Sequence, residues 1–325
     1  MINLTTNYAG LTLRNPLIVS SSGLTDSIDK IGKLEKAGAG AVVLKSLFEE
    51  QIKYEAGDLS KHTDYPQAED YLNYYVRSNS VEQYLKLIEN ARKSVDIPVI
   101  ASINCFSATE WVSFAKQIEK AGAHALELNV YFLPLEKDTS SKIYEDVYLK
   151  LAAEIRKLIS IPVIFKLGQN FTNPVNLVDQ LYNRGIQAVV LFNRFYSPDI
   201  NVDELKVVSS SALSTPEEIR NSLRWVAIVS HFVEKIDIAA STGIHDGKAV
   251  IKQLLAGAKA VQVCSVLYKK GPAWLGDMIA RVEEWMKKNN YSNPDEFRGK
   301  MNYGNIKDPV VFERAQFMKY YSSQH

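Results

Sequence analysis

Lysine and asparagine stand at the ends of several short apolar segments of this sequence. The lysines are Lys45 and Lys166. The asparagines are Asn104, Asn129 and Asn193. If the segments are neighbouring strands, these ends meet at one mouth and form a cationic, amide-rich site with few acids, which suits the stabilisation of negative charge. Unpaired polar groups in such a mouth are costly, so their repetition favours a binding site over plain solvated loop.

Small residues follow the last two apolar segments and are suited to holding a phosphate. They are Ser241-Thr242-Gly243 and Cys264-Ser265, which offer hydroxyls and accessible backbone N–H groups, and Gly271-Pro272 then opens a helix. Loops after the seventh and eighth strands of a barrel, with a helix N-terminus, are a common phosphate site. We therefore expect a phosphate group on the ligand. His245 lies nearby and is interpreted either as a helix cap or as a neighbour of that phosphate.

The apolar segments have the length of strands, and amphipathic helical patterns separate them. Eight strands that each precede a helix predict a (β/α)8 TIM barrel, an α/β fold. We expect a single domain over residues 1–325, with a barrel core at about 16–288 and a C-terminal extension at 289–325. The expected strands are Pro16–Ser20, Ala41–Lys45, Val99–Asn104, Ala125–Tyr131, Val163–Leu167, Ala188–Asn193, Ile236–Ser241 and Ala260–Ser265. The expected helices include Val81–Val95, Ala108–Ala121 and Tyr148–Ile159.

A doubly wound open sheet is the alternative architecture. It would require a glycine-rich turn after the first strand, and Ser20-Ser21-Ser22-Gly23 lacks the G-x-G-x-x-G spacing. Glycine instead ends four of the helical segments, where a left-handed cap is expected. These glycines are Gly38, Gly122, Gly185 and Gly257.

Three of the loops that follow strands are long, namely 46–80, 133–142 and 194–215. Long loops in compact domains are usually lids or binding loops. In a barrel, loops after strands lie on the active face, so we expect these three to surround the site.

Composition excludes several classes of protein. The 325 residues carry 38 Lys+Arg and 37 Asp+Glu, a formal charge of +1, which gives no field for steering nucleic acid or an anionic membrane. No apolar run reaches the roughly 20 residues that a bilayer requires, and no signal peptide is recognisable. The cysteines Cys105 and Cys264 make neither a disulfide framework nor a zinc or iron–sulfur site. We expect a cytoplasmic protein with no bound metal and a small-molecule substrate.

The strand ends, in this order, resemble the class 1 dihydroorotate dehydrogenases of pyrimidine biosynthesis and the flavin domain of dihydropyrimidine dehydrogenase. The resemblance runs from Gly10 to about Leu267. The matching segments are Gly10–Leu17, Gly38–Ser46, Pro98–Asn104, Ala125–Asn129, Phe165–Leu167, Ala212–Pro216 and Leu254–Ala258. The resemblance implies a TIM barrel that binds FMN, transfers hydride from a dihydropyrimidine ring to the flavin, and forms a homodimer.

The resemblance also implies roles for individual residues. Ser20 and Ser21 would lie against the flavin, with Ser46 beside them. Lys45 would contact both the flavin and the substrate carboxylate, and Asn193 would bind the pyrimidine. The residues implied to line the flavin ring are Asn104, Asn129 and Lys166, with Asn129 also near the substrate. Those implied to bind the ribityl chain and phosphate are Thr215, Thr242, Gly243, Cys264 and Ser265.

The family's chemistry gives the lysines Lys45 and Lys166 a catalytic role. Two-electron reduction of a flavin places negative charge at its N1–C2=O edge. A fixed cation at about 4 Å contributes about 4 kcal/mol at an effective dielectric near 20.

The sequence departs from the family at the general base. The family motif Asn-Leu-Ser-Cys-Pro-Asn supplies a cysteine that takes a proton from dihydroorotate, and here Phe132 occupies that position. Phenylalanine cannot accept a proton, and a general base commonly contributes about 10²–10⁴ in rate. Cys105, at the neighbouring strand end, is a candidate replacement, and Tyr131 is a weaker one.

Other departures concern the ligand loops. The family's Asn-Ser-Met-Gly-Leu substrate motif has no match in 46–80, and Arg194 stands where the family has Ser or Thr. Ser241, Thr242 and Cys264 replace glycines of the phosphate loops, which is tolerable if their φ angles are negative.

Three functions remain open at this point. The first is an FMN-dependent oxidoreductase that acts on dihydroorotate or a related ring. The second is a flavin-binding protein that lacks turnover because the base is missing. The third is a phosphate-binding barrel lyase or isomerase, for which Lys45 or Lys166 could form a Schiff base.

Overall fold

Eight parallel strands form a closed barrel in this computed structural model, which describes residues 2–48, 66–104, 108–195 and 197–313. The strands pair in the order β4-β3-β13-β12-β9-β8-β7-β6, and a β4–β6 pairing closes the ring. The barrel strands are β3 (Leu17–Val19), β4 (Ala41–Val43), β6 (Val99–Asn104), β7 (Ala125–Asn129), β8 (Val163–Leu167), β9 (Ala188–Leu191), β12 (Asp237–Ser241) and β13 (Ala260–Val263). The predicted TIM barrel is confirmed.

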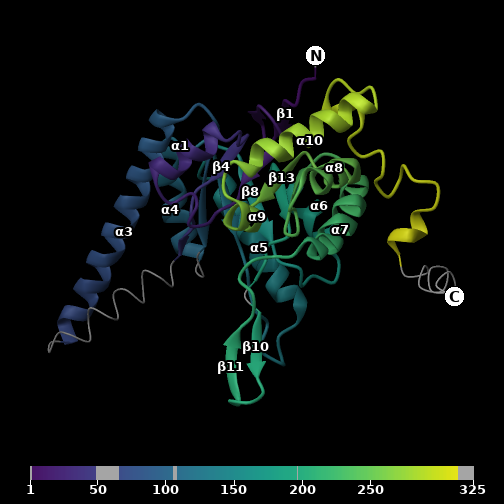
Figure 1. Ribbon diagram of the computed structural model, residues 1–325. Coiled ribbons are helices and arrows are strands. Elements are labelled where there is room, and N and C mark those ends of the chain that lie inside the picture. Colours follow the sequence, from purple (N-terminus) through teal and green to yellow (C-terminus); the bar gives the residue numbers. More distant parts are fainter. Residues whose placement is uncertain (1, 49–65, 105–107, 196, 314–325) are drawn as a thin grey trace.

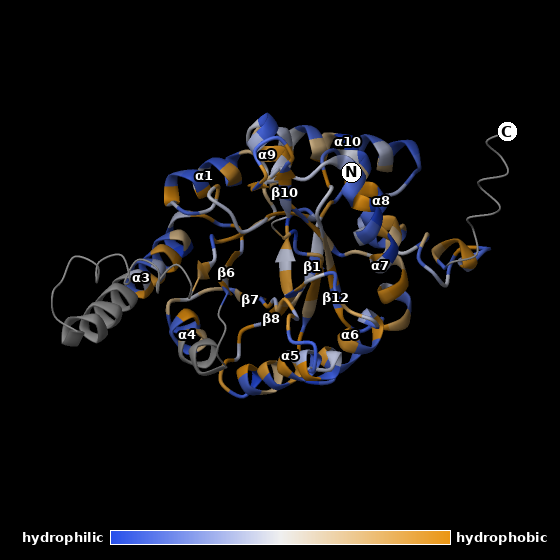
Figure 2. Cartoon of the chain, turned by 90° about the horizontal axis from the view of Figure 1, so that it is seen from below, coloured by the Kyte–Doolittle hydropathy of each residue, from blue (hydrophilic) through white to orange (hydrophobic). Residues whose placement is uncertain are grey.

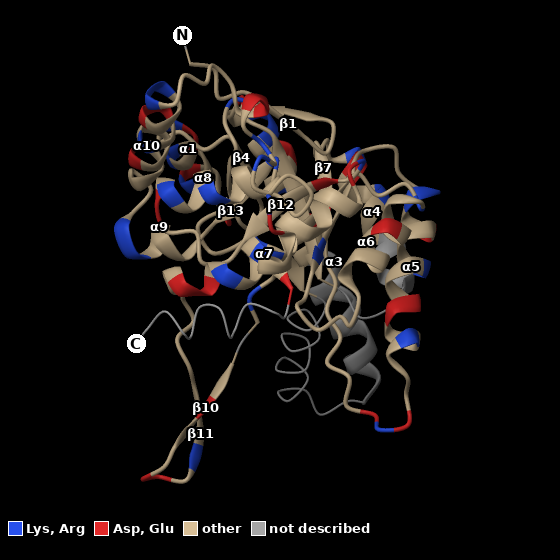
Figure 3. Cartoon of the chain, turned by 90° about the vertical axis from the view of Figure 1, so that its right-hand side faces the viewer, with Lys and Arg blue, Asp and Glu red and all other residues tan. Residues whose placement is uncertain are grey.

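Helices surround this ring, as the view along the barrel in Figure 2 shows. They are α1 (Ile28–Lys36), α3 (Pro66–Ser94), α4 (Ala108–Lys120), α5 (Ser141–Arg156), α6 (Pro174–Tyr182), α7 (Ile219–Phe232), α8 (Gly247–Ala256), α9 (Ser265–Lys270) and α10 (Trp274–Lys288). The four glycines expected to end helices all have positive φ angles, from +81° to +118°. Among the described residues, no helix is long and apolar enough to cross a bilayer. Basic and acidic residues alternate over the face in Figure 3, consistent with the near-zero charge.

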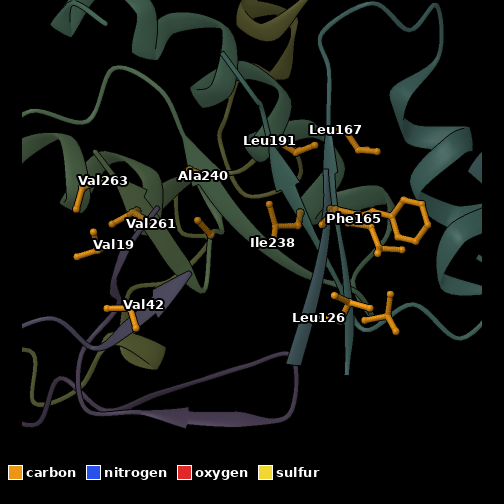
Figure 4. Packing of buried hydrophobic residues seen from close by; sticks show 14 of the residues in the cluster. Val19, Val42, Leu126, Phe165, Leu167, Leu191, Ile238, Ala240, Val261 and Val263 are labelled. Atoms are coloured by element: carbon orange, nitrogen blue, oxygen red, sulfur yellow. The ribbon is translucent and has the colours of Figure 1, made fainter. Parts of the chain in front are cut away.

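Two layers of apolar side chains hold the barrel together. One layer lies between the strands and the helices, and it includes Val42, Leu126 and Phe165 (Figure 4). The other fills the barrel interior, where every second strand residue points inward. Alanines are frequent in this inner layer, namely Ala41, Ala125, Ala188, Ala239 and Ala260. Their small side chains leave room for a plug from outside the ring.

An N-terminal hairpin supplies that plug. Its strands, β1 (Thr6–Tyr8) and β2 (Leu11–Leu13), pair antiparallel and pack Tyr8 and Leu13 into the inner layer. The backbone N–H of Ala9 donates to the carboxylate of Asp237, at 2.7 Å, and so fastens the hairpin to β12. The hairpin therefore covers the end of the barrel at which the strands begin, and ligands must use the opposite end.

The long loops contain more regular structure than the sequence analysis predicted. The first, 46–80, includes the short strand β5 (Leu47–Phe48) and the start of α3 at Pro66. The loop prediction was wrong there because the segment from Pro66 to Ser94 contains no further proline and no glycine to stop a helix. Helix α5 likewise begins at Ser141, two turns before the predicted start.

The third long loop, 194–215, carries a second hairpin. Its strands are β10 (Pro198–Asn201) and β11 (Lys206–Ser209), and they extend away from the ring on the side opposite β1 (Figure 1). Ile200 and Val207 lie opposite each other across this hairpin and are 65% and 72% exposed. The hairpin therefore marks the mouth side of the barrel.

Candidate functional site

A cavity of about 160 Å³ opens at the carboxyl ends of the barrel strands. Its lining comes from β8, β12 and β13 and from the segments after β3, β9, β11, β12 and β13. The lining residues are Ser20, Ser21, Lys166, Asn193, Arg194, Ala212, Ser214, Ser241, Thr242, Gly243, Ile244, Gln262, Cys264 and Ser265. The structure thus brings together most of the residues that the resemblance assigns to the flavin and its phosphate.

Lys166 lies at the base of this cavity within a buried polar network. Its Nζ donates to the hydroxyl of Ser20 at 3.0 Å and to the side-chain oxygen of Gln262 at 2.9 Å. The carboxylate of Glu127, which is fully buried, lies 3.8 Å away and also accepts a hydrogen bond from the Gln262 amide. A buried ammonium group requires such partners. The network therefore fixes a positive charge beneath the cavity.

The sequence analysis missed Glu127 and Gln262. Each interrupts an otherwise apolar strand, Ala125–Asn129 and Ala260–Val263. A charged or amide side chain in a strand buried on both faces is a signal that could have identified them, because such groups seldom lie inside without a partner. The network also affects Tyr8 below it. Burial raises the pKa of Tyr8, and the carboxylates of Glu127 and Asp237 raise it further.

Two asparagines pair at the mouth. The side-chain amide of Asn193 donates to the side-chain oxygen of Asn129 at 2.8 Å, and the backbone N–H of Asn193 donates to Leu167 at 2.8 Å. These contacts tie the segment after β9 to the ends of β7 and β8. Asn193 lines the cavity, whereas Asn129 does not. Asn104, at the end of β6, is half-buried and does not line the cavity.

A chain of hydroxyls supports the first strand end. Ser21 accepts a hydrogen bond from the backbone N–H of Ser46 at 2.8 Å, and their hydroxyls lie 3.0 Å apart. The Ser46 hydroxyl is 2.7 Å from that of Ser102, whose backbone binds the hydroxyl of Tyr84. Ser46 is therefore placed behind Ser21 and does not line the cavity.

Lys45 and Thr215 also lie outside the cavity lining. Lys45 has the inward parity of Ala41 and Val43, but it stands past the end of β4 and its side chain is exposed. Thr215 is exposed at the start of a short 3-10 helix, where its backbone N–H donates to Glu218 at 2.7 Å. The preceding residue, Ser214, is the one that reaches the cavity.

Ser214 lies in the part of the cavity where the phosphate is expected. Its backbone N–H donates to the hydroxyl of Ser265 at 2.9 Å, and its backbone carbonyl accepts from Nζ of Lys269 at 2.8 Å. Its own hydroxyl lies 3.0 Å from Nε2 of His245. His245 is not the helix cap, because Asp246 caps α8 by accepting from the backbone N–H of Ala249.

The loop after β12 adopts a left-handed backbone at two successive residues. Thr242 has a φ angle of +76° and Gly243 one of +77°. The condition of a negative φ is therefore not met at Thr242, whose hydroxyl donates to the carbonyl of Phe192 at 3.1 Å and helps to hold this conformation. A side chain at Gly243 would lie 2.1 Å from the backbone nitrogen of Ile219. Cys264 has a φ angle of −147°, as expected.

Arg194 adds a second cation to the cavity lining. Its Nε donates to the carboxylate of Glu218 at 2.8 Å, and another of its nitrogens donates to the carbonyl of Ala212 at 3.2 Å. These contacts hold the guanidinium between the start of α7 and the end of the long loop. Neither Arg194 nor Lys166 is suited to act as a general base, because a guanidinium has no acceptor atom and Lys166 donates to Ser20 and Gln262 beside Glu127.

Phe132 lies in the loop after β7, where its ring packs edge-on against Tyr148. It lines a separate cavity of about 240 Å³ between this loop and the one after β8. The neighbouring Tyr131 stacks on Phe195, with 3.6 Å between ring centroids. Cys105, the candidate replacement base, lies outside the described residues.

Cys264 is the one thiol among the residues that the structure describes along the main cavity. Burial raises its pKa, although a hydrogen bond with Ser22 and the charge of Lys166 oppose that effect. The thiol is therefore protonated at neutral pH. The described lining contains no carboxylate and no imidazole.

Comparison with known proteins identifies relatives over nearly the whole chain. A family model described as dihydroorotate dehydrogenase matches residues 3–286. A protein of Thermoplasma volcanium named dihydroorotate dehydrogenase B (NAD(+)), catalytic subunit, is 28% identical over 309 residues, which cover 92% of this chain and 98% of that protein. A protein of the same name from Methanothermobacter thermautotrophicus is 27% identical, covering 91% and 97%. A putative dihydroorotate dehydrogenase A (fumarate) of Aeropyrum pernix is 27% identical, covering 87% and 92%.

Proposed function

The chain belongs to the dihydroorotate dehydrogenase family, and from this premise we propose that it binds FMN in the main cavity and oxidises a dihydropyrimidine ring. Dihydroorotate, which would be converted to orotate, is the proposed substrate. One observation carries the proposal. A single cavity joins the buried ammonium of Lys166 to the Ser214 and Ser265 end, so that one ligand with a ring and a phosphate would meet both.

The residues present suit FMN at both ends. Gly243 leaves no space for a side chain between the loop after β12 and the start of α7, which keeps backbone N–H groups open to a ligand. Ser214, Ser265 and Lys269 bring hydroxyls and an ammonium group to the same end. FMN, when bound, supplies hydride chemistry that side chains lack.

The chain's own residues would then act by position and charge. Lys166, held by its contacts with Glu127 and Gln262, would place a positive charge near the part of the flavin that becomes negative on reduction. Electrostatic preorganisation of this kind is commonly the largest catalytic effect. The Asn193–Asn129 pair would bind and orient the substrate ring at the mouth. Lys45, exposed past β4, would approach the substrate carboxylate.

We also propose that the protein is a cytoplasmic homodimer. Its only proposed ligand besides FMN is the small-molecule substrate. The relatives' names assign two electron acceptors, NAD(+) and fumarate. Some relatives are named catalytic subunits, which implies a further subunit in those proteins.

A second candidate function is flavin binding without turnover of dihydroorotate. Phe132 favours it, because its ring replaces the expected base and packs on Tyr148. Neither the cationic groups nor the protonated Cys264 thiol in the described lining can take the proton.

Two measurements decide between these functions. Purified protein that binds FMN should absorb at about 450 nm. Dihydroorotate added in the absence of oxygen should then reduce the flavin and bleach that band. Colour that persists with dihydroorotate and with related dihydropyrimidines would favour flavin binding without turnover. Colourless protein that takes up no FMN would contradict both functions and favour a lyase or isomerase.

A further inference from the structure

The phosphate end of the cavity contains an imidazole that no family motif accounts for. His245 is half-buried, and its Nε2 lies 3.0 Å from the hydroxyl of Ser214. Ser214 is buried and lines the cavity, whereas His245 stands behind it. The backbone of His245 is fixed, since its carbonyl accepts a hydrogen bond from the indole N–H of Trp274 at 3.0 Å. His245 can therefore reach a ligand through Ser214.

We propose that His245 takes up a proton from solvent when FMN binds and, through Ser214, makes the protein bind FMN more tightly at pH 6.5 than at pH 8. The proposal rests on the proposed function, because it requires the phosphate of FMN at this end of the cavity.

The tighter binding follows from the direction in which the Ser214 hydroxyl donates its hydrogen. A serine hydroxyl has one hydrogen to donate. Neutral His245 with a free Nε2 lone pair accepts that hydrogen, so the hydroxyl then offers the cavity only lone pairs. Protonated His245 instead donates to the Ser214 oxygen, and the serine hydrogen turns toward the cavity. A phosphate dianion only accepts hydrogen bonds, so it favours the second arrangement.

The surrounding charges favour the same exchange. Burial and the nearby Lys269 ammonium lower the pKa of His245, while the carboxylates of Glu218, Asp246 and Glu217 raise it by less. In the free protein His245 therefore stays neutral at pH values where an ordinary histidine has already begun to take up a proton. Lys269 is anchored on the carbonyl of Ser214, next to the proposed phosphate position. A bound dianion offsets the repulsion from Lys269 and so raises the pKa of His245.

The test uses protein from which flavin has been removed, titrated with FMN at pH 8 and at pH 6.5 while flavin fluorescence is followed. A hydrogen bond to a charged group is worth about 1 kcal/mol more than one to a neutral group, which corresponds to about a fivefold change in Kd. The full factor applies only at a pH below both the free and the bound pKa of His245. Because the pKa of His245 is lowered in the free protein, we expect the FMN Kd of the unmodified protein to fall about twofold between pH 8 and pH 6.5. The phosphate of FMN itself titrates near pH 6 in every variant, so differences between variants report on the protein.

Three variants separate the parts of the proposal. His245→Gln and Ser214→Ala should both bind FMN with a Kd that changes much less between the two pH values. The matched control is His231→Gln, since His231 stacks against Phe232 and Tyr303 at the end of α7 and does not line the cavity. It should keep the twofold change in Kd.

Each part of the proposal has a result that would overturn it. An FMN Kd that is the same at both pH values in the unmodified protein, or an unchanged pH dependence in His245→Gln, would overturn the role of His245. A change lost in His245→Gln but retained in Ser214→Ala would overturn transmission through Ser214. FMN that binds with a flat pH profile leaves the proposed function intact, whereas no FMN binding at either pH overturns that function together with this proposal.

Discussion

The carboxylate of Glu127 lies 3.8 Å from the ammonium of Lys166, and both side chains are buried inside the barrel. Two charges in such a place stabilise each other only as a pair, because each alone would be costly to keep out of water. Their positions, on the neighbouring strands β7 and β8, make the pair part of the barrel wall.

Glu127→Gln should therefore destabilise the fold. Removing one partner leaves Lys166 buried without its counter-charge, and the expected loss is about 3–5 kcal/mol in the free energy of unfolding. Urea denaturation monitored by circular dichroism measures it. Glu204→Gln is the matched control, because Glu204 pairs with Lys206 at an exposed site and should change stability by less than about 0.5 kcal/mol. Equal losses in the two variants would contradict the buried pair.

Gly243→Ala should disrupt the phosphate end of the cavity. The new Cβ would lie 2.1 Å from the nitrogen of Ile219, at a residue whose φ angle is +77°. We expect a loss of about 2–5 kcal/mol in stability together with weaker FMN binding. Gly10→Ala isolates the backbone effect, since Gly10 has a φ angle of +76° but open space around it. That variant should lose about 1–2 kcal/mol and bind FMN normally.

Phe132→Cys should raise the rate at which dihydroorotate reduces the bound flavin. A thiol at this position restores the group that the family uses as a base, and general bases commonly contribute about 10²–10⁴ in rate. Anaerobic stopped-flow mixing measures the rate. Phe132→Ser opens the same space without a thiol, and it should not accelerate reduction. If serine and cysteine give the same rate, the base position has been misassigned.

Glu119→Gln should lower stability at pH 7, and by less at pH 3.5. Burial alone would raise the pKa of Glu119, but hydrogen bonds from Ser160 and Ile161 outweigh it and lower the pKa below 4.5. A lowered pKa in the folded state means that the carboxylate stabilises the fold above its unfolded pKa and loses that effect as pH falls. We expect a difference of about 1 kcal/mol between variant and unmodified protein at pH 7.

Urea titrations of the unmodified protein and of Glu119→Gln at the two pH values test this. The difference should shrink as the pH falls from 7 to 3.5, because the carboxylate of Glu119 takes up a proton as the pH approaches its lowered pKa. A difference that persists unchanged at pH 3.5 would show that it does not arise from the charge of Glu119.

Much of the barrel could be predicted from sequence because its signals are local. The strands Val99–Asn104 and Val163–Leu167 were predicted with their observed bounds, since apolar runs between a helix stop and a polar end have few other structures. Gly257 was predicted to cap the helix now labelled α8, because glycine favours the left-handed backbone that such a cap requires, and its φ is +118°. Lys166 and Ser265 were placed near the cavity by their positions at strand ends alone.

Other features depend on contacts between distant segments, and local patterns do not carry them. The choice between Ser214 and Thr215 as the cavity residue depends on which of them the 3-10 helix Pro216–Glu218 takes as its cap. The positive φ of Thr242 is held by a hydrogen bond to Phe192, 50 residues away. The β1–β2 hairpin contributes only short runs, and its place in the barrel depends on Asp237.

The hairpin that closes the floor of the barrel also constrains the order in which the molecule can be assembled. Ala9 binds Asp237, which lies 228 residues later in the chain, and β3 completes its pairing with β13, which is later still. During synthesis the hairpin must therefore wait, without its contact to β12, until nearly all of the barrel has emerged. Until then Tyr8 and Leu13 lack the inner layer that buries them in the folded protein, so this apolar segment is one that a chaperone would be expected to shield.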